Sequence, residues 1–121
     1  MAKYRAVFVE EATEYLAEIS RSLFELEKEP ASGEAIDLIF RMAHSIKGMA
    51  ASLDFASITQ TAHALEDRMQ IIREAGKISP GGELAELFEG LEALEAMVAS
   101  VRETGEAPAE AMVAKKKLQM S

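Results

Sequence analysis

The feature that most constrains the fold is the spacing of apolar residues, which recur every three or four positions in one segment after another. Such spacing is typical of amphipathic helices, whereas a half-buried strand needs an apolar residue at every second position. Period-two alternation does not persist anywhere, so the sequence predicts an all-α fold. The first apolar stripe contains Phe8, Ala12, Tyr15, Leu16, Ile19, Leu23 and Leu26.

Proline and glycine divide the helical pattern into segments. We expect helices over residues 5–27, 34–53, 57–75 and 83–101, with Ser57 as an N-cap and Gly76 as a C-terminal cap. The linkers are short, which favours an up-down antiparallel four-helix bundle over residues 1–104. Residues 105–121 are expected to hold a short fifth helix, over 109–118, and the start of a linker.

Composition and charge exclude several classes of protein. The formal net charge of -8 argues against binding to nucleic acid or to anionic membranes. The absence of cysteine excludes disulfides and thiolate metal sites. No run of about 18 apolar residues is present, and the N-terminus lacks a signal-peptide core. We therefore expect a cytoplasmic, monomeric domain without membrane insertion.

The second expected helix is apolar over most of its circumference, and its remaining wedge carries the polar residues of interest. His44 lies at the edge of this wedge, and Gly48, four residues later, is its neighbour on the surface. A glycine inside a helix costs about 1 kcal/mol relative to alanine. Two explanations are open: space for a partner to reach the imidazole, or close packing against another helix.

The third expected helix offers partners for His44. Glu66 lies at the border of its core face, with His63 three residues before it. If the two helices are antiparallel, Glu66 can accept the Nδ1 proton of His44 and leave Nε2 as a nucleophile. A phosphoryl group is one electrophile that such a nitrogen can attack. In that case Lys47 could donate a hydrogen bond to an oxygen of the incoming phosphoryl group, and His63 could orient Glu66 or contact phosphate.

Other interpretations of the same residues stay open. A histidine at a helix edge is usually an ordinary surface residue, and Lys47 and Glu66 could be solvated charges. A zinc or iron site formed by His44, His63 and Glu66 is disfavoured, because no His-x-x-x-His or Glu-x-x-His pair is present. A helical adaptor that binds a partner helix and carries no phosphate is a further alternative.

The strongest indication is a resemblance. The segment 44–50 (His-Ser-Ile-Lys-Gly-Met-Ala) closely resembles the phosphorylation motif of the N-terminal phosphotransfer domain of the chemotaxis histidine kinase CheA. Segments 8–16, 40–43 and 63–66 also resemble that family, and the likeness covers about residues 5–101. One departure is Asp54, because many members have glycine before the following phenylalanine. Phosphorelay phosphotransfer domains share the His-x-x-Lys-Gly core and are the alternative within this class.

The resemblance implies a bundle, often of five helices, that carries a phosphoryl group on His44. By position, Glu66 would hydrogen-bond the ring, and Lys47 and His63 would join the polar network. The phosphoryl group would come from the ATP-binding domain of a kinase and go to an aspartate of a CheY-like or CheB-like response regulator.

Several expectations about partners and cofactors follow. The chain has no glycine-rich nucleotide-binding box and holds no cofactor of its own, so partner domains would supply ATP and magnesium. It is expected to be a fragment of a larger kinase or a stand-alone carrier, and in the first case to be associated with chemoreceptor clusters. The expected partner surface contains Arg41, Ser45, Gly48 and Ser52.

Overall fold

The computed structural model describes residues 2–108, and four helices account for most of them. In chain order these are α1 (Ala2–Lys28), α2 (Gly33–Ser52), α3 (Ala56–Ala75) and α4 (Glu83–Thr104). The described residues contain no strand. The expected all-α four-helix bundle is confirmed, whereas the fifth helix expected over 109–118 lies outside the described residues.

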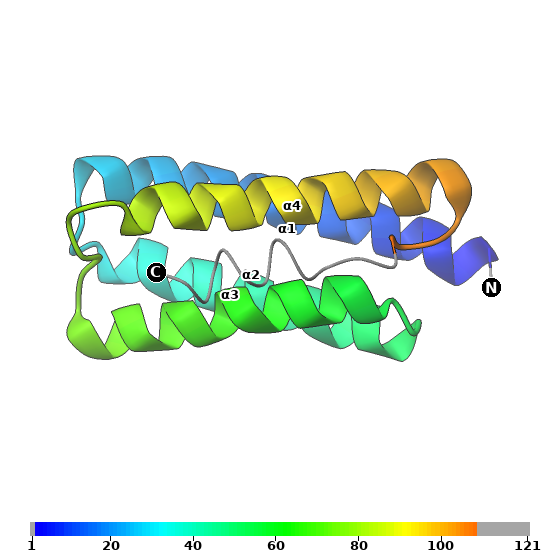
Figure 1. Cartoon of the computed structure of the whole chain (residues 1–121), viewed down its shortest axis with the longest axis horizontal. Coiled ribbons are helices and arrows are strands. Elements are labelled where there is room, and N and C mark those ends of the chain that lie inside the picture. Colours follow the sequence, from blue (N-terminus) through cyan, green and yellow to red (C-terminus); the bar gives the residue numbers. More distant parts are fainter. Residues whose placement is uncertain (1, 109–121) are drawn as a thin grey trace.

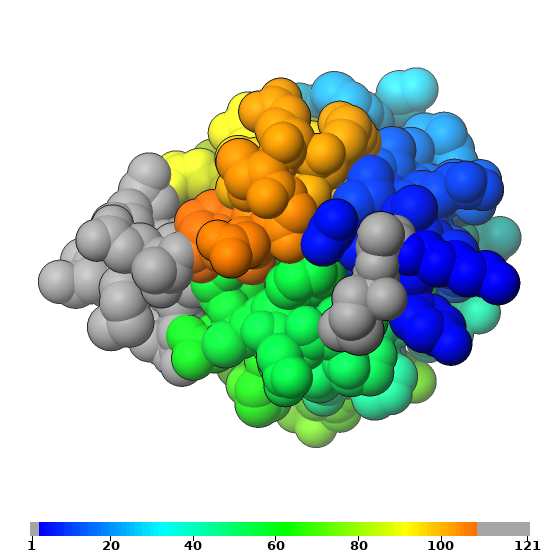
Figure 2. Space-filling view, turned by 90° about the vertical axis from the view of Figure 1, so that its right-hand side faces the viewer, coloured from blue at the N-terminus to red at the C-terminus, as the bar shows by residue number. Residues whose placement is uncertain are grey.

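The helices form two layers, with α1 and α4 above α2 and α3 in Figure 1. Each helix packs against its two neighbours around the bundle, most extensively α2 against α3. Within the described residues, the backbones of the diagonal pairs, α1 with α3 and α2 with α4, stay apart, and only core side chains lie between them. Figure 2 views the end of the bundle where α1 begins, α2 turns into α3 and α4 ends.

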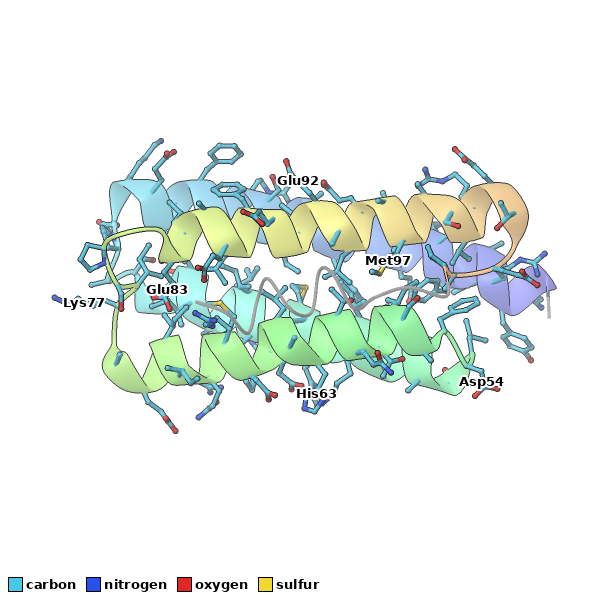
Figure 3. All side chains as sticks on the ribbon, viewed as in Figure 1. Asp54, His63, Lys77, Glu83, Glu92 and Met97 are labelled. Carbon is cyan, nitrogen blue, oxygen red and sulfur yellow. The ribbon has the colours of Figure 1, made fainter. Side chains whose placement is uncertain are left out.

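The core consists of the apolar stripes that the sequence predicts. Every residue of the first predicted stripe is buried except Tyr15, which is partly buried. The other three helices also bury one apolar stripe each, and Phe40, Leu53, Leu84 and Phe88 are only partly buried. The buried face of α4 includes Met97, which points into the interior in Figure 3. Removing a buried leucine from such a core costs about 2–5 kcal/mol, so the buried stripes contribute much of the stability of the bundle.

The helix ends follow local chemistry. Ser32 caps α2, because its Oγ accepts a hydrogen bond from the backbone N–H of Ala35 at 3.2 Å. Gly76 ends α3 with a φ of 86°, in the left-handed region that favours glycine. This confirms the expected C-terminal cap.

The prediction that Ser57 is the N-cap of the third helix is wrong. The cap residue is Phe55, whose side chain makes no capping bond, and Ser57 is buried inside the first turn. The centre of the Phe55 ring lies 5.2 Å from that of Phe8 on α1, so the residue that precedes α3 packs against the first helix. Asp54 makes the preceding turn with a φ of 61°.

Among residues 2–108, no helix has the length and apolar character that crossing a bilayer requires.

Candidate functional site

The pairing of α2 with α3 brings His44 and Glu66 together. The Nδ1 atom of His44 lies 2.5 Å from Oε2 of Glu66, a hydrogen-bonding distance between residues 22 positions apart in the sequence. The two side chains differ sharply in exposure, because the imidazole is 63% exposed and the carboxylate is 10% exposed. The site therefore consists of the exposed imidazole of His44, whose Nδ1 contacts the buried carboxylate of Glu66.

The charge of Glu66 follows from its surroundings. Burial works to raise the pKa of this carboxyl group, because it disfavours the charged form. The bonds from Lys47 and His44, together with the charges of these two residues, act in the opposite direction and prevail. The pKa of Glu66 therefore lies below its usual value, and the group is a carboxylate at neutral pH.

A carboxylate at this position determines the tautomer of His44. A carboxylate only accepts hydrogen bonds, so the short contact requires a proton on Nδ1. In a neutral imidazole the other nitrogen, Nε2, then carries a free lone pair. The contact also orients the ring and stabilises any positive charge that develops on it. The arrangement therefore presents an oriented nitrogen nucleophile on an exposed side chain.

Lys47 completes the support of Glu66. Its Nζ lies 2.5 Å from Oε1 of Glu66, so each carboxylate oxygen has one partner. The lysine side chain is 27% exposed, so it is only partly buried. An ammonium group has three N–H donors, so the pair with Glu66 does not exhaust them. A phosphate contact by Lys47 stays a prediction.

Gly48 lies beside His44 on the exposed side of α2. A Cβ atom built on this glycine would meet no atom of another element within 4 Å. Close packing against a neighbouring helix, one of the two explanations that the sequence leaves open, therefore has no support in the structure. What Gly48 provides is open surface next to the imidazole.

The structure does not bring His63 into the pair. Its Nε2 lies 3.4 Å from Oδ1 of Asp67 on the same helix, and the side chain points away from the bundle in Figure 3. Ser45 is partly buried, whereas Ser52 is exposed and its hydroxyl donates to the carbonyl of Met49 at 2.9 Å. In the described residues, no three acidic or histidine side chains are gathered as a metal ion would require.

Two further residues, which sequence reasoning did not select, lie where α2 packs against α3. Asp37 accepts a hydrogen bond from Arg41 at 2.9 Å and also lies 3.3 Å from a guanidinium nitrogen of Arg73 on α3. The position of Asp37 on the same face as His44 was visible from its spacing. The approach of Arg73 was not, because it depends on how α3 aligns with α2.

The fold and this site define a class: a four-helix bundle with one exposed, oriented histidine on its second helix. The protein-family model that describes the Hpt domain, the histidine phosphotransfer domain, matches residues 3–104 of this sequence. The chain therefore belongs to the Hpt domain family.

Within this family the chain is similar to the phosphotransfer domains of chemotaxis proteins. It is 33% identical over 106 residues to the chemotaxis protein CheA of Halobacterium salinarum, a match that covers 88% of this chain and 16% of that protein. The chain thus spans about a sixth of the length of this relative.

Solved structures agree with this placement. The solution structure of the histidine phosphotransfer domain of CheA has a TM-score of 0.85 and 30% identity, and the match covers 98% of this chain and 91% of that one. The phosphorylated P1 domain of CheA3 from R. sphaeroides, solved in complex with CheY6, has a TM-score of 0.87. Its identity of 21%, over 99% of this chain and 95% of that one, shows the shared fold alone.

Proposed function

We propose that this chain is the phosphocarrier domain of a chemotaxis-type two-component kinase. His44 takes a phosphoryl group from ATP bound to the catalytic domain of the kinase and passes it to an aspartate of a CheY-like or CheB-like response regulator. The observation that carries this proposal is the exposed imidazole of His44 with its Nδ1 held by the buried carboxylate of Glu66. A structural histidine has no need of exposure, and an adaptor surface has no need of a fixed tautomer.

In the loading step, the lone pair of Nε2 attacks the γ-phosphorus of ATP. A nitrogen–phosphorus bond forms, the bond between this phosphorus and the bridging oxygen breaks, and ADP leaves with the electron pair. The ring then carries a positive charge, because Nδ1 keeps its proton. Glu66 stabilises that charge at 2.5 Å, and Lys47 holds Glu66 in place.

In the unloading step, a carboxylate oxygen of the regulator's aspartate attacks the same phosphorus. The nitrogen–phosphorus bond breaks, and its electron pair returns to Nε2 as the ring becomes neutral again. The regulator supplies the magnesium ion for this step. Partner domains likewise supply the ATP, and the carrier itself binds neither.

This function places the chain in the cytoplasm, where ATP is available, and at chemoreceptor clusters if the whole kinase assembles there. The R. sphaeroides relative supports the regulator as a partner, because that P1 domain was solved in complex with CheY6. The domain itself is proposed to act as a monomer. Gly48 and the exposed side of α2 are proposed to face the incoming partner, together with Arg41, Ser45 and Ser52.

The test is direct phosphorylation. The chain is incubated with ATP and a chemotaxis-type kinase core that has been shown to act on another phosphotransfer domain, and acid-labile phosphate is then mapped. We expect label on His44 that moves to an added receiver domain. In the His44→Gln variant we expect no label and an unchanged thermal unfolding midpoint.

Two outcomes would contradict the proposal. Acid-labile label that persists in His44→Gln would move the phosphoacceptor to another residue. Failure of the wild-type chain with several active kinase cores would favour the adaptor interpretation instead.

A further inference from the structure

Arg73 on α3 forms a second polar contact with α2, at a distance from His44. One of its guanidinium nitrogens lies 3.3 Å from Oδ1 of Asp37, and its guanidinium carbon lies 4.5 Å from the centre of the Phe40 ring. The other carboxylate oxygen of Asp37 accepts a hydrogen bond from Nε of Arg41, on its own helix, at 2.9 Å. We call the contact of Arg73 with Asp37 and Phe40 the Arg73 bridge.

The Arg73 bridge and the pair of His44 with Glu66 are two crossings of one helix interface. Helices α2 and α3 pack against each other and run in opposite directions (Figure 1). Asp37 lies seven residues before His44 on α2, and Arg73 lies seven residues after Glu66 on α3. Seven residues are about two helical turns, a rise of about 10 Å, so both pairs require the same alignment of the two helices. A slide of one helix along the other would open both pairs together.

The second partners repeat in the same way. Lys47 is the second α2 partner of Glu66, and Phe40 is the second α2 partner of Arg73. Each of them follows the first α2 partner by three residues, which is close to one turn. Each crossing therefore consists of one charged α3 side chain held by two α2 side chains, with an anion on α3 at one crossing and a cation at the other.

This reversal of sign selects one alignment of the helices. A slide by seven residues is the displacement that a heptad spacing of apolar residues tolerates best. In one direction it would place Glu66 beside Asp37, an anion against an anion. In the other direction it would place Arg73 beside Lys47, a cation against a cation. Like charges repel at such distances, so the charges disfavour both slipped alignments.

The contact between His44 and Glu66 needs a closer alignment than the burial of the core requires. The His44 side chain is 63% exposed, so the core does not enclose it. Hydrophobic burial is non-directional, whereas a hydrogen bond weakens steeply as its geometry departs from the optimum. The 2.5 Å contact of Nδ1 with the carboxylate therefore depends on directional contacts elsewhere along the same two helices.

We propose that the Arg73 bridge positions the phosphoacceptor: it fixes the alignment of α2 with α3, which holds Glu66 at Nδ1 of His44 and keeps Nε2 free of the proton. This inference rests on the phosphocarrier function proposed above. The residues of the bridge lie about two turns from the reacting nitrogen, so they are positioning residues that act through Glu66. The side chains of Asp37 and Arg73 are 40% and 44% exposed, and ion pairs of this kind contribute little to folding stability.

The first measurement is the tautomer of His44 in the unphosphorylated chain. At alkaline pH, where the ring is neutral, the nitrogen chemical shifts distinguish a proton on Nδ1 from one on Nε2. We expect the proton mainly on Nδ1 in wild type and a smaller Nδ1-protonated population in Arg73→Gln and in Asp37→Asn. The double variant should lose no more than the more affected single variant, because the two residues act as one unit.

The second measurement is loading by phosphoramidate, which needs no partner protein. The phosphoryl group moves to Nε2 of His44, the nitrogen–phosphorus bond of the reagent breaks, and ammonia leaves. Since a misplacement of about 1 Å can cost roughly 100-fold in rate, a shift of about 0.3 Å corresponds to about fourfold. We therefore expect Arg73→Gln to slow loading about fourfold. Arg73→Lys keeps the charge beside Asp37 and should restore part of the rate.

The matched control is Arg102→Gln. Arg102 donates to Oγ1 of Thr13 at 3.1 Å, so it joins α4 to α1 as Arg73 joins α3 to α2. This variant should keep both the tautomer and the loading rate of wild type. His44→Gln should take no label, and thermal unfolding of every variant shows whether the bundle is intact.

An unchanged tautomer and loading rate in Arg73→Gln would overturn the proposal, and a lower unfolding midpoint in that variant would leave the bridge a purely structural role. Slower loading with an unchanged tautomer would also overturn it, because the effect would then not pass through Glu66. The carrier function fails separately. If the tautomer shifts as expected but wild-type His44 takes no phosphate, the positioning role stands and the phosphocarrier proposal falls.

Discussion

Replacing Gly48 separates the two requirements that meet on α2, helix stability and access to the imidazole. In Gly48→Ala the new methyl group meets no other element within 4 Å, so no repulsion opposes the better helix propensity of alanine. We expect the free energy of unfolding to rise by about 1 kcal/mol. For a domain of this size that corresponds to an increase of about 4 °C in Tm.

Function should change in the opposite direction. A side chain at position 48 extends into the open surface beside His44, where a partner must bring the phosphorus within bonding distance of Nε2. A displacement of about 1 Å can cost roughly 100-fold in rate. We therefore expect Gly48→Leu to lower the rate of phosphotransfer at least about tenfold, and Gly48→Ala to lower it less.

The assay pairs urea denaturation with single-turnover transfer on the same preparations. Ala96→Leu, at an exposed position of α4, is the matched control for added bulk and should leave transfer unchanged. A loss of stability in Gly48→Ala would show that the glycine is needed for packing. Transfer at the wild-type rate in Gly48→Leu would refute the idea that the glycine keeps the approach open.

Three further predictions concern stability. Because the folded-state pKa of Glu66 lies below the usual value of about 4.3, its ionised form stabilises the fold above that pH and the contribution is lost as pH falls through the lowered pKa. The free energy of unfolding, measured by urea denaturation, should therefore decrease more between about pH 6 and about pH 3 for wild type than for Glu66→Gln. Equal decreases would contradict the pairing. Asp54→Gly should stabilise by about 0.5 kcal/mol, since a φ of 61° is strained for aspartate, and a lower Tm would show that its side chain contributes contacts. Ser32→Ala should cost about 1 kcal/mol by loss of the α2 cap, and an unchanged denaturation midpoint would exclude that role.

The fold was predictable because helical periodicity determines which residues are buried. The stripes of α1 to α4 appear in the core with few exceptions, and Gly76 ends α3 as expected. The start of α3 was not predictable from local signals. Ser57 has the side chain of a good cap, but the helix begins after Phe55, whose ring packs against Phe8, a residue far away in the sequence.

The site was predictable to the extent that it depends on one helix. The relation of His44 to Lys47 and Gly48 follows from residue spacing alone. Which residues of α3 face them depends on how the two helices align, and residue spacing left open whether His63 joins Glu66 at the site. In the structure, Glu66 lies toward α2 and His63 points outward to Asp67.

In the proposed function one residue serves two partners, and the division of exposure at this site suits that role. A nucleophile buried for protection would need a lid, and a lid shaped for the kinase would obstruct the regulator. Here the nucleophile is exposed, and the groups that orient it come from below the surface, through the buried Glu66 and the partly buried Lys47. The orientation of His44 therefore does not depend on which partner is bound. In the proposed function, selection between partners falls to the surrounding surface, where Gly48 leaves room beside the imidazole.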